Sequence, residues 1–413
     1  MPDEIVLRSP TAEELPRFIA PLSIAFLEEF TEAAIENERR TIELDRSVGA
    51  LEGDHVVGYS GAYSFRLTVP GGEVGAAGVT AVGVLPSHRR RGILRRMMTW
   101  LFAQARERHE PVAILWASEA AIYQRFGYGP ATLSSAFEIA TDKVRFRRPT
   151  EAAGRMRIVG LDEAAERFPP VYEVVRRSTP GALNRTDARW RWEVLYDAEW
   201  FRHGDGAKIL ALYEVDGDAR GYVIYRTRSD WDTTGPKGAV IVQELTAVDS
   251  AAEQALWEWV TGIDLIASVR LRRGPLPHPL QLLLTEPRRL GMTITDGSWL
   301  RIIDLPDALS ARSYTGSGEL VLDVTDEFCP ANAGRWRLTA SSGGGSGAAV
   351  VPAGDAAPDL ALDISDVAAA YLGAFRFADL ERAGRVRECR PGAAAEADAL
   401  FRTDRAPMTS TMF

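Results

Sequence analysis

The chain has 413 residues, 46% of them hydrophobic and 25% charged, which is ordinary globular usage and excludes a disordered, collagen-like or coiled-coil protein. At about 150 residues per domain, this length predicts two or three domains. Asp and Glu outnumber Lys and Arg by 57 to 48, giving a net charge of -9. An acidic chain is a poor non-specific nucleic-acid binder, because that affinity depends on phosphate contacts, and it attracts cationic small molecules instead.

The cysteines and histidines predict neither a disulfide framework nor a metal site. Only Cys329 and Cys389 occur, and the five histidines are scattered without an HExxH pair. The first residues lack the apolar run of a signal peptide. No stretch approaches the roughly 20 apolar residues that a membrane span needs. We therefore expect a cytoplasmic protein with no metal, no nucleic-acid partner and no membrane contact.

The first 150 residues mix helical and strand patterns, which predicts an α+β fold with α/β-like mixed sheets. A Thr-x-x-Glu capping box at Thr11 and Glu14 opens the first helical pattern. Apolar periodicity predicts helices over 11–26, 28–40 and 119–126, and a long helix after Gly92. Alternating and buried-strand patterns predict strands over 47–51, 55–69, 75–84, 111–117 and 132–140.

The rest of the chain predicts two further units. An Arg- and Pro-containing stretch at 145–149 is typical of an exit from the first unit. Beyond it, strands are expected at 207–215, 221–228 and 239–245, followed by a helix over 250–263. The third unit, 316–413, contains a helical pattern at 364–372. Its Gly/Ser-rich stretch at 341–347 predicts an exposed turn, because no strand-to-helix transition surrounds it.

A weak internal repeat relates the first two units. Leu245-Thr-Ala-Val248 before a helix parallels Val79-Thr-Ala-Val82 before a helix. The second copy continues with the acidic segment Asp249 to Glu253, where the first has a basic, glycine-containing loop. The pattern indicates a duplicated fold whose second copy has lost an anion site; coincidence is the alternative.

The strongest chemical signal is the segment 79–100, VTAVGVLPSHRRRGILRRMMTW. A strand pattern ends at Val84, and three arginines with Gly92 then open a helix. Free N–H groups at a helix start, the positive end of the helix dipole and arginines together bind anions. Gly92 lets a phosphate approach the backbone closely. The segment lacks the Lys-Ser/Thr pair of a P-loop, so it predicts a pyrophosphate site without magnesium; the alternative is a solvated basic face.

A second signal is the segment 117–129, ASEAAIYQRFGYG. Ser118 is expected to cap a helix that begins at Glu119, and Tyr123 lies four residues later on the same helical face. The helix follows a buried strand, so it starts at the carboxyl edge of the sheet, where ligands of open α/β sheets bind. A tyrosine there can donate a proton to a leaving group, or it can simply be a packing residue.

These residues resemble a known family. Arg90-Arg91-Gly92 after a Val-x-Val strand resembles the acyl-CoA motif of the GNAT N-acetyltransferases. The longer pattern HRRRGILRRMM with SEAAIYQRFGYGPAT closely resembles the Eis (enhanced intracellular survival) acetyltransferases, in which a residue such as Leu94 replaces the Gly or Ala of many GNAT members. The resemblance covers the whole chain. It implies a GNAT catalytic domain at 1–150, a GNAT-like domain without a cofactor site at 151–305, and a sterol-carrier-like domain at 306–413 whose C-terminus reaches the active site.

The resemblance also implies the site residues. Acetyl-CoA, as co-substrate, would pair its pantetheine amides with the strand residues Val82, Gly83 and Val84. Its pyrophosphate would bind at the helix start, on Arg90, Arg91, Gly92, Ile93, Leu94 and Arg95. Further along, the cofactor would contact Ser118 and Glu119. Tyr123 matches the family's proton donor, and the α-carboxylate of Phe413 matches its proton acceptor.

The function implied is acetyl transfer from acetyl-CoA to primary amines of a polycationic acceptor, either aminoglycoside-like or a lysine side chain, by direct attack. The family's assembly implies a homohexamer. Two alternatives remain at this stage: a carrier or binding protein for an apolar or acyl ligand, acting through the C-terminal domain, and an acyltransferase that uses a longer acyl-CoA such as propionyl-CoA. The acidic residues Glu28, Glu29, Glu32 and Glu36 predict either the lining of a cationic pocket or a solvated helix face.

Overall fold

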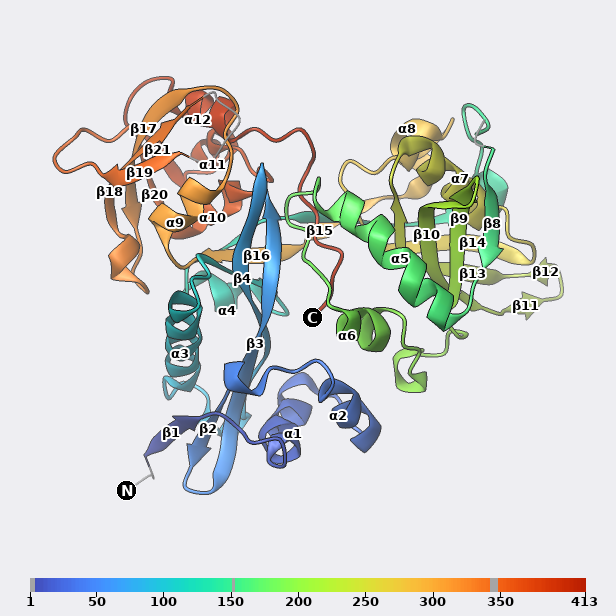
Figure 1. Ribbon diagram of the computed structural model, residues 1–413, viewed down its shortest axis with the longest axis horizontal. Helices are drawn as coiled ribbons and strands as arrows, with labels where there is room; N and C mark the ends of the chain where they lie inside the picture. Colours follow the sequence, from blue (N-terminus) through green and yellow to red (C-terminus); the bar gives the residue numbers. More distant parts are fainter. Residues whose placement is uncertain (1–3, 151–152, 342–347) are drawn as a thin grey trace. The chain divides into compact units, whose positions relative to one another are not determined.

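The computed structural model describes residues 4–150, 153–341 and 348–413, which form two compact units (Figure 1). Unit 1 combines the chain up to Thr132 with Ser298–Asp404 and Thr411–Phe413. Unit 2 combines Leu133–Gly297 with Arg405–Ser410. Each unit is therefore built from segments that are distant in the sequence.

A seven-stranded mixed sheet forms the N-terminal part of unit 1. Its strands, in spatial order, are β1 (Ile5–Arg8), β2 (Ser47–Glu52), β3 (His55–Val69), β4 (Gly72–Val84), β5 (Val112–Trp116), β16 (Ser298–Ile302) and β6 (Tyr128–Pro130). β3 and β4 are antiparallel, whereas β4 and β5 are parallel and are joined by helix α3 (Ile93–Glu107). The strands predicted at 47–51, 55–69, 75–84 and 111–117 are confirmed within a few residues.

Helices cover both faces of this sheet, because successive strand residues point to opposite sides. Val48 and Ala50 of β2 pack against Ile93 and Met97 of α3. Leu51 of the same strand packs on the opposite side, against helix α1 (Leu15–Phe26). The result is a three-layer arrangement with the sheet in the middle, which is the α+β class that the sequence predicts.

The first two helices begin later than the sequence predicts. The capping-box bonds do form, from the Thr11 N–H to Glu14 at 3.1 Å and from the Glu14 N–H to Thr11 at 3.4 Å. They enclose a turn ahead of α1, however, because Glu14 is drawn into an ion pair with Arg8 at 2.6 Å and the helix starts beyond it. Helix α2 spans only Glu32–Glu38, since Thr31 supplies its N-cap by accepting the Ala34 N–H.

The two large sheets exchange strands. β7 (Leu133–Ala140), predicted as a strand over 132–140, follows the first set of strands in sequence but lies in the sheet of unit 2. β16 comes from the second stretch of chain but pairs with β5 and β6 in unit 1. The compact units therefore do not coincide with continuous stretches of the sequence. The domain limits expected at residues 150 and 305 stay a prediction.

Unit 2 repeats the arrangement around β4. Its sheet contains, in order, β15 (Thr293–Asp296), β7, β14 (Ile266–Gly274), β13 (Gly238–Ala247), β10 (Asp218–Arg228), β9 (Ile209–Val215) and β8 (Arg155–Ile158). β10 and β13 are antiparallel, β13 and β14 are parallel, and α7 (Ser250–Thr261) follows β13 as α3 follows β4. The other elements are α5 (Leu161–Arg176), α6 (Asp187–Arg189), α8 (Leu280–Leu283), β11 (Trp231–Asp232) and β12 (Gly235–Pro236).

A five-stranded sheet with four helices forms the C-terminal part of unit 1. The strands are β19 (Ala349–Pro352), β18 (Gly334–Ala340), β17 (Gly318–Thr325), β20 (Leu360–Asp363) and β21 (Val386–Glu388). The helices are α9 (Leu305–Ala311), α10 (Ile364–Tyr371), α11 (Phe377–Arg382) and α12 (Ala393–Phe401). Helix α10 confirms the helical pattern predicted at 364–372. Of the Gly/Ser-rich stretch 341–347, residues 342–347 lie outside the described residues.

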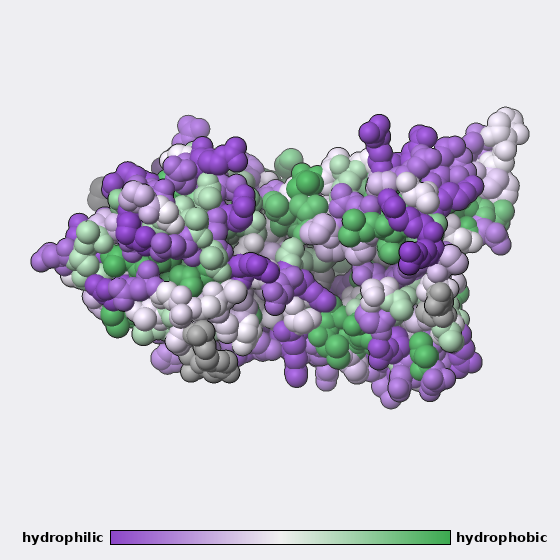
Figure 2. All heavy atoms as spheres, turned by 90° about the horizontal axis from the view of Figure 1, so that it is seen from above, coloured by the Kyte–Doolittle hydropathy of each residue, from purple (hydrophilic) through white to green (hydrophobic). Residues whose placement is uncertain are grey.

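Hydrophilic and hydrophobic side chains are interspersed over the face seen in Figure 2. Among the described residues, no helix is long and apolar enough to cross a bilayer.

A buried arginine joins two helix ends in the C-terminal part. Arg312 is fully buried and donates hydrogen bonds to the carbonyls of Tyr371 at 2.5 Å and Phe401 at 3.0 Å. These residues are the last of α10 and α12, where carbonyl groups lack helical partners. The guanidinium also lies over the Phe401 ring, 4.4 Å from its centroid. Arg312 therefore completes the hydrogen bonding of both helix ends at once.

We expect Arg312→Met to destabilise the protein by on the order of 3 kcal/mol, because two buried carbonyls lose their charged donor. The measurement is the midpoint of thermal unfolding. Arg382→Met is the matched control, since Arg382 is exposed at the end of α11, and it should leave the midpoint nearly unchanged. Equal midpoints for the two variants would contradict this role for Arg312.

Candidate active site

Strands β4 and β5 separate inside the N-terminal sheet. They pair at only three positions, the last of which joins Gly78 to Ile114. β4 then runs on to Val84 with β3 on one edge, and no described strand pairs with its other edge there. Ala81, with φ of +52°, lies where the β3–β4 register shifts. Val82, Gly83 and Val84 therefore present backbone groups to an opening in the sheet.

Helix α3 begins at Ile93, after the loop that follows β4, with no side-chain cap. Its N-cap is Gly92, in the left-handed region with φ of +76°. A Cβ at this position would meet no atom within 4 Å, so glycine is needed for its backbone conformation and not for space. The N–H groups of Ile93, Leu94 and Arg95 form the first turn, at the positive end of the helix dipole. This is the geometry of an anion-binding helix start.

The three predicted arginines differ in their partners. Arg91 donates a hydrogen bond to Glu52 at 2.6 Å, and His88 contacts the other carboxylate oxygen at 3.0 Å. These two partners, Arg91 first, lower the pKa of the Glu52 carboxyl. Arg95 lies over the Phe328 ring, 4.9 Å from its centroid. Arg90 is exposed and forms no ion pair within the described part of the chain. Sequence reasoning missed Glu52 as a partner of Arg91, because the two residues are 39 positions apart in the chain.

Tyr123 lies on helix α4 (Ala120–Gln124) with a side chain only 6% exposed. It shares one hydrophobic cluster with Val79 of β4, Met98 of α3 and Leu115 of β5. Its ring meets the Tyr128 ring edge to face, with centroids 5.8 Å apart. Burial, with a smaller effect of Glu119, raises the pKa of Tyr123 to about 12. The hydroxyl therefore stays protonated throughout the physiological range.

Ser118 and Glu119 lie exposed between the end of β5 and the start of α4. The prediction that Ser118 caps this helix was wrong. The helix begins at Ala120, and Glu119 occupies the N-cap position with an extended backbone and no side-chain cap bond. Ser118 thus lies one residue too early for its hydroxyl to reach the first turn.

The last residues of the chain meet the point where β4 and β5 part. The Phe413 ring packs on Phe65, with centroids 5.0 Å apart, and a Cβ on Gly78 would lie 3.2 Å from it. Trp116, the last residue of β5, donates its indole N–H to the Thr411 carbonyl at 3.0 Å. The structure therefore brings residues 82–84, 90–95, 123 and 413 to one end of this sheet. Sequence reasoning missed Phe65 and Trp116, whose patterns resemble ordinary strand residues.

The helices that pack near the bulge in β4 carry acidic residues. Ala81 packs against the cluster that includes Phe18 of α1 and Ile35 of α2. The carboxylate residues of this helical region are exposed; they are Glu28, Glu29, Glu32 and Glu36. Glu36 pairs with Arg39 at 3.5 Å, whereas the other three carboxylates can attract a cation.

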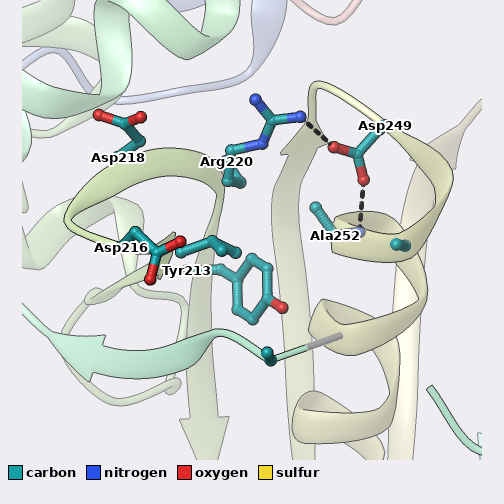
Figure 3. A pocket seen from close by; sticks show the side chains of 9 residues that line it. Tyr213, Asp216, Asp218, Arg220, Asp249 and Ala252 are labelled. Atoms are coloured by element: carbon teal, nitrogen blue, oxygen red, sulfur yellow. Dashed lines mark hydrogen bonds and ion pairs between the residues drawn. The ribbon is translucent and has the colours of Figure 1, made fainter. Parts of the chain in front are cut away.

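The equivalent helix start in unit 2 holds a carboxylate of its own (Figure 3). Asp249 caps α7 by accepting the Ala252 N–H at 2.8 Å, and Arg220 pairs with its other oxygen at 2.5 Å. The Ala252 hydrogen bond is the main cause of the lowered pKa of Asp249, and Arg220 adds to it. A pocket of about 350 Å³ lies beside these residues. Asp249 thus takes the place that an external anion would need.

Among the residues that the structure describes, no group of three or more His, Cys, Asp or Glu side chains could hold a metal ion. Cys329 and Cys389 are both free thiols.

Known families match all three parts of the chain. Residues 6–131 and 181–302 each match an acetyltransferase (GNAT) domain family, and residues 305–410 match a sterol carrier protein domain. These matches define an acetyltransferase with two GNAT domains and a C-terminal sterol-carrier domain, as the sequence predicts.

Similar proteins extend over almost the whole chain. An uncharacterized N-acetyltransferase of Streptomyces avermitilis is 41% identical, covering 91% of this chain and 92% of its own. N-acetyltransferase Eis of Mycobacterium tuberculosis is 34% identical over 97% of both chains. The crystal structure of Eis1 from Mycobacterium abscessus superposes with a TM-score of 0.83 at 32% identity, covering 99% of this chain and 100% of that one. The protein belongs to the Eis family of GNAT N-acetyltransferases.

We expect Tyr123 to titrate near pH 12, because its hydroxyl is withdrawn from water and ionisation would place a charge among apolar side chains. The measurement is an NMR titration of ring-labelled tyrosine, with Tyr123→Phe identifying the signal. The residue should remain neutral through pH 10. A midpoint below pH 10 would contradict the assigned environment.

Proposed function

We propose that this protein transfers an acetyl group from acetyl-CoA to primary amines of a polycationic acceptor, by direct attack and without a covalent enzyme intermediate. The observation that carries the proposal is the meeting of four features in unit 1: the unpaired edge of β4, the uncapped start of α3, Tyr123 and the end of the chain. GNAT acetyltransferases use acetyl-CoA, so the question is which residues of this chain would hold it.

The residues present fit acetyl-CoA. A pantetheine arm carries amides, and the open edge of Val82, Gly83 and Val84 offers backbone groups to pair with them. A pyrophosphate fits the start of α3, where Gly92 leaves the first-turn N–H groups open. Arg90 has no carboxylate partner in the described part of the chain and could bind it as well. The other residues proposed here are Arg91, Ile93, Leu94 and Arg95 at the helix start, with Ser118 and Glu119 further along the cofactor.

The proposed chemistry needs few groups from the protein. A neutral amine attacks the thioester carbonyl, the carbon–nitrogen bond forms and the carbon–sulfur bond breaks. Backbone N–H groups near Val84 stabilise the developing oxyanion. Tyr123 then hydrogen-bonds the departing sulfur and supplies the proton that makes it a thiol. Because a buried phenol with a pKa of about 12 is a weaker acid than a thiol, this proton transfer is uphill, and the tyrosinate regains a proton from solvent as the thiol leaves.

The proton that the amine loses needs an acceptor. With Phe413 as the last residue, its α-carboxylate is the group proposed for this role. The Phe65 and Trp116 contacts support it, because they hold the chain end at the opening between β4 and β5. A carboxylate also attracts an ammonium group, which orients the amine before it is deprotonated.

The acceptor proposed is a small polyamine of the aminoglycoside type, or a lysine side chain. Exposed carboxylates on the α1–α2 side of β4 and the net charge of -9 support a polycation. The open helix start and Tyr123 favour catalysis over a carrier function, since a carrier would need neither. A homohexamer in the cytoplasm stays a prediction from the family resemblance.

The direct test is a thiol-release assay with acetyl-CoA and a panel of amines. We expect release with aminoglycosides carrying several primary amines, and a fall in kcat of about 100-fold or more in Tyr123→Phe, since the sulfur loses its hydrogen-bond donor. Tyr128→Phe is the matched control, because its buried hydroxyl has no hydrogen-bond partner among the residues that the structure describes. Absence of release with every amine would favour the carrier function, and full activity of Tyr123→Phe would remove Tyr123 from the mechanism.

The role of Phe413 has a separate test. Deleting Phe413, or extending the chain beyond it, should abolish acetyl transfer while acetyl-CoA binding survives, because the carboxylate is lost or displaced and the α3 helix start is untouched. Calorimetric titration of acetyl-CoA and the thiol-release assay measure the two effects. Unchanged turnover in both variants would refute the role.

A further inference from the structure

The loop between β17 and β18 of the C-terminal part reaches the N-terminal part of the same unit. Phe328 of this loop packs against the hydrophobic cluster that contains Tyr123, and Cys329 is a buried member of that cluster. The Phe328 ring meets the rings of Phe102 on α3 and Phe126 just after α4 edge to face, with centroids 5.4 and 5.1 Å apart. The loop therefore contacts both helices that carry the proposed coenzyme and proton-donor residues.

Buried polar side chains fix the backbone of this loop. Asp326 is buried, and one of its carboxylate oxygens pairs with Arg301 of β16 at 2.5 Å. The same oxygen accepts a hydrogen bond from the buried Asn332 side chain at 3.0 Å. The other oxygen accepts the N–H groups of Phe328 and Cys329 at 3.2 and 2.9 Å. The Phe328 ring is therefore carried by a backbone that is tied to the N-terminal sheet through β16.

The Phe328 ring also holds a residue of the proposed pyrophosphate site. Arg95 is the third residue of α3, so its side chain leaves the helix in the turn whose N–H groups are open. Its guanidinium lies over the Phe328 ring, 4.9 Å from the centroid, which is within the roughly 6 Å of a cation–π interaction. No carboxylate among the described residues forms an ion pair with Arg95. The aromatic ring is therefore the contact that orients this guanidinium.

We propose that Phe328 is a positioning residue for Arg95, and that the part of the chain matching the sterol carrier family thereby contributes to acetyl-CoA affinity. The inference rests on the proposed function, in which Arg95 binds the pyrophosphate. An exposed arginine samples many side-chain conformations, and binding a phosphate costs the entropy of selecting one of them. The ring restricts the guanidinium beforehand, which reduces that cost. Unlike a carboxylate, it leaves the charge and the N–H groups available to a phosphate.

The test measures acetyl-CoA affinity by calorimetric titration of the full chain. Phe328→Leu removes the ring and should raise Kd about threefold, the size expected for an exposed cation–π contact. The loss should appear in KM for acetyl-CoA and not in kcat. Phe328→Tyr keeps the ring and should bind as the wild type does. Phe328→Met fills the space without a ring, so it should match Phe328→Leu, and it takes the place of that variant if Phe328→Leu does not fold.

Phe377→Leu is the matched control for a general loosening of the C-terminal part. It removes a buried ring from α11 of that part, which has no contact with the start of α3. It should lower the midpoint of thermal unfolding and leave Kd for acetyl-CoA unchanged. A rise in Kd equal to that of Phe328→Leu would overturn a specific role for the Phe328 ring.

A second substitution shows whether Phe328 acts through Arg95. Arg95→Met should raise Kd by itself, and adding Phe328→Leu to it should raise Kd no further. An unchanged Kd in Phe328→Leu, or an equal further rise in the combined variant, overturns the positioning role even where the wild type acetylates amines. A wild type that binds acetyl-CoA but releases no thiol with any amine overturns the proposed function, and the affinities still decide the role of Phe328. A wild type that does not bind acetyl-CoA overturns both.

Discussion

The short pairing of β4 with β5 is the constraint on which the site depends. A parallel pair that ends at Gly78 leaves the rest of β4 without a neighbour on one edge. Backbone groups on such an edge need partners, and an amide-bearing ligand can supply them. The same separation makes room for the chain end and lets α4 carry Tyr123 into the cluster between β4, β5 and α3. If β4 were paired along its whole length, the open backbone edge, the space for the chain end and the position of Tyr123 would all be lost.

The two copies of the fold use the equivalent helix start in opposite ways. In unit 1 the start of α3 has no side-chain cap and has basic residues in front of it. In unit 2 the start of α7 is satisfied internally by Asp249 and Arg220. A carboxylate of the protein itself stabilises the helix start without any bound ligand, whereas a helix start without a cap remains available to bind an anion. This difference at the helix start supports the proposal that only the first copy binds the coenzyme.

The sequence predicted the elements better than their partners. The strands within 47–84 and the helix after Gly92 followed from periodicity and turn residues, because those signals are local. The repeat followed from the match of Leu245–Val248 with Val79–Val82. Glu52 beside Arg91, Trp116 beside Thr411 and the early end of β4–β5 pairing did not, since each joins residues far apart in the chain. Ser118 failed as a cap because a shift of one residue in a helix start moves the hydroxyl out of reach.

The exchange of β7 and β16 between the sheets bears on how such a protein can be dissected. A gene cut between the first and second GNAT segments would remove β16 from its place between β5 and β6 and leave both of these strands with unpaired edges. Depending on where the cut falls, β7 either stays with the first fragment without its partner strands β14 and β15 or goes with the second fragment. Unpaired edges of this kind invite intermolecular pairing and precipitation. The two GNAT segments therefore cannot be separated by truncation without breaking both sheets. If they arose by duplication, the two copies have depended on one continuous chain since β7 and β16 were exchanged.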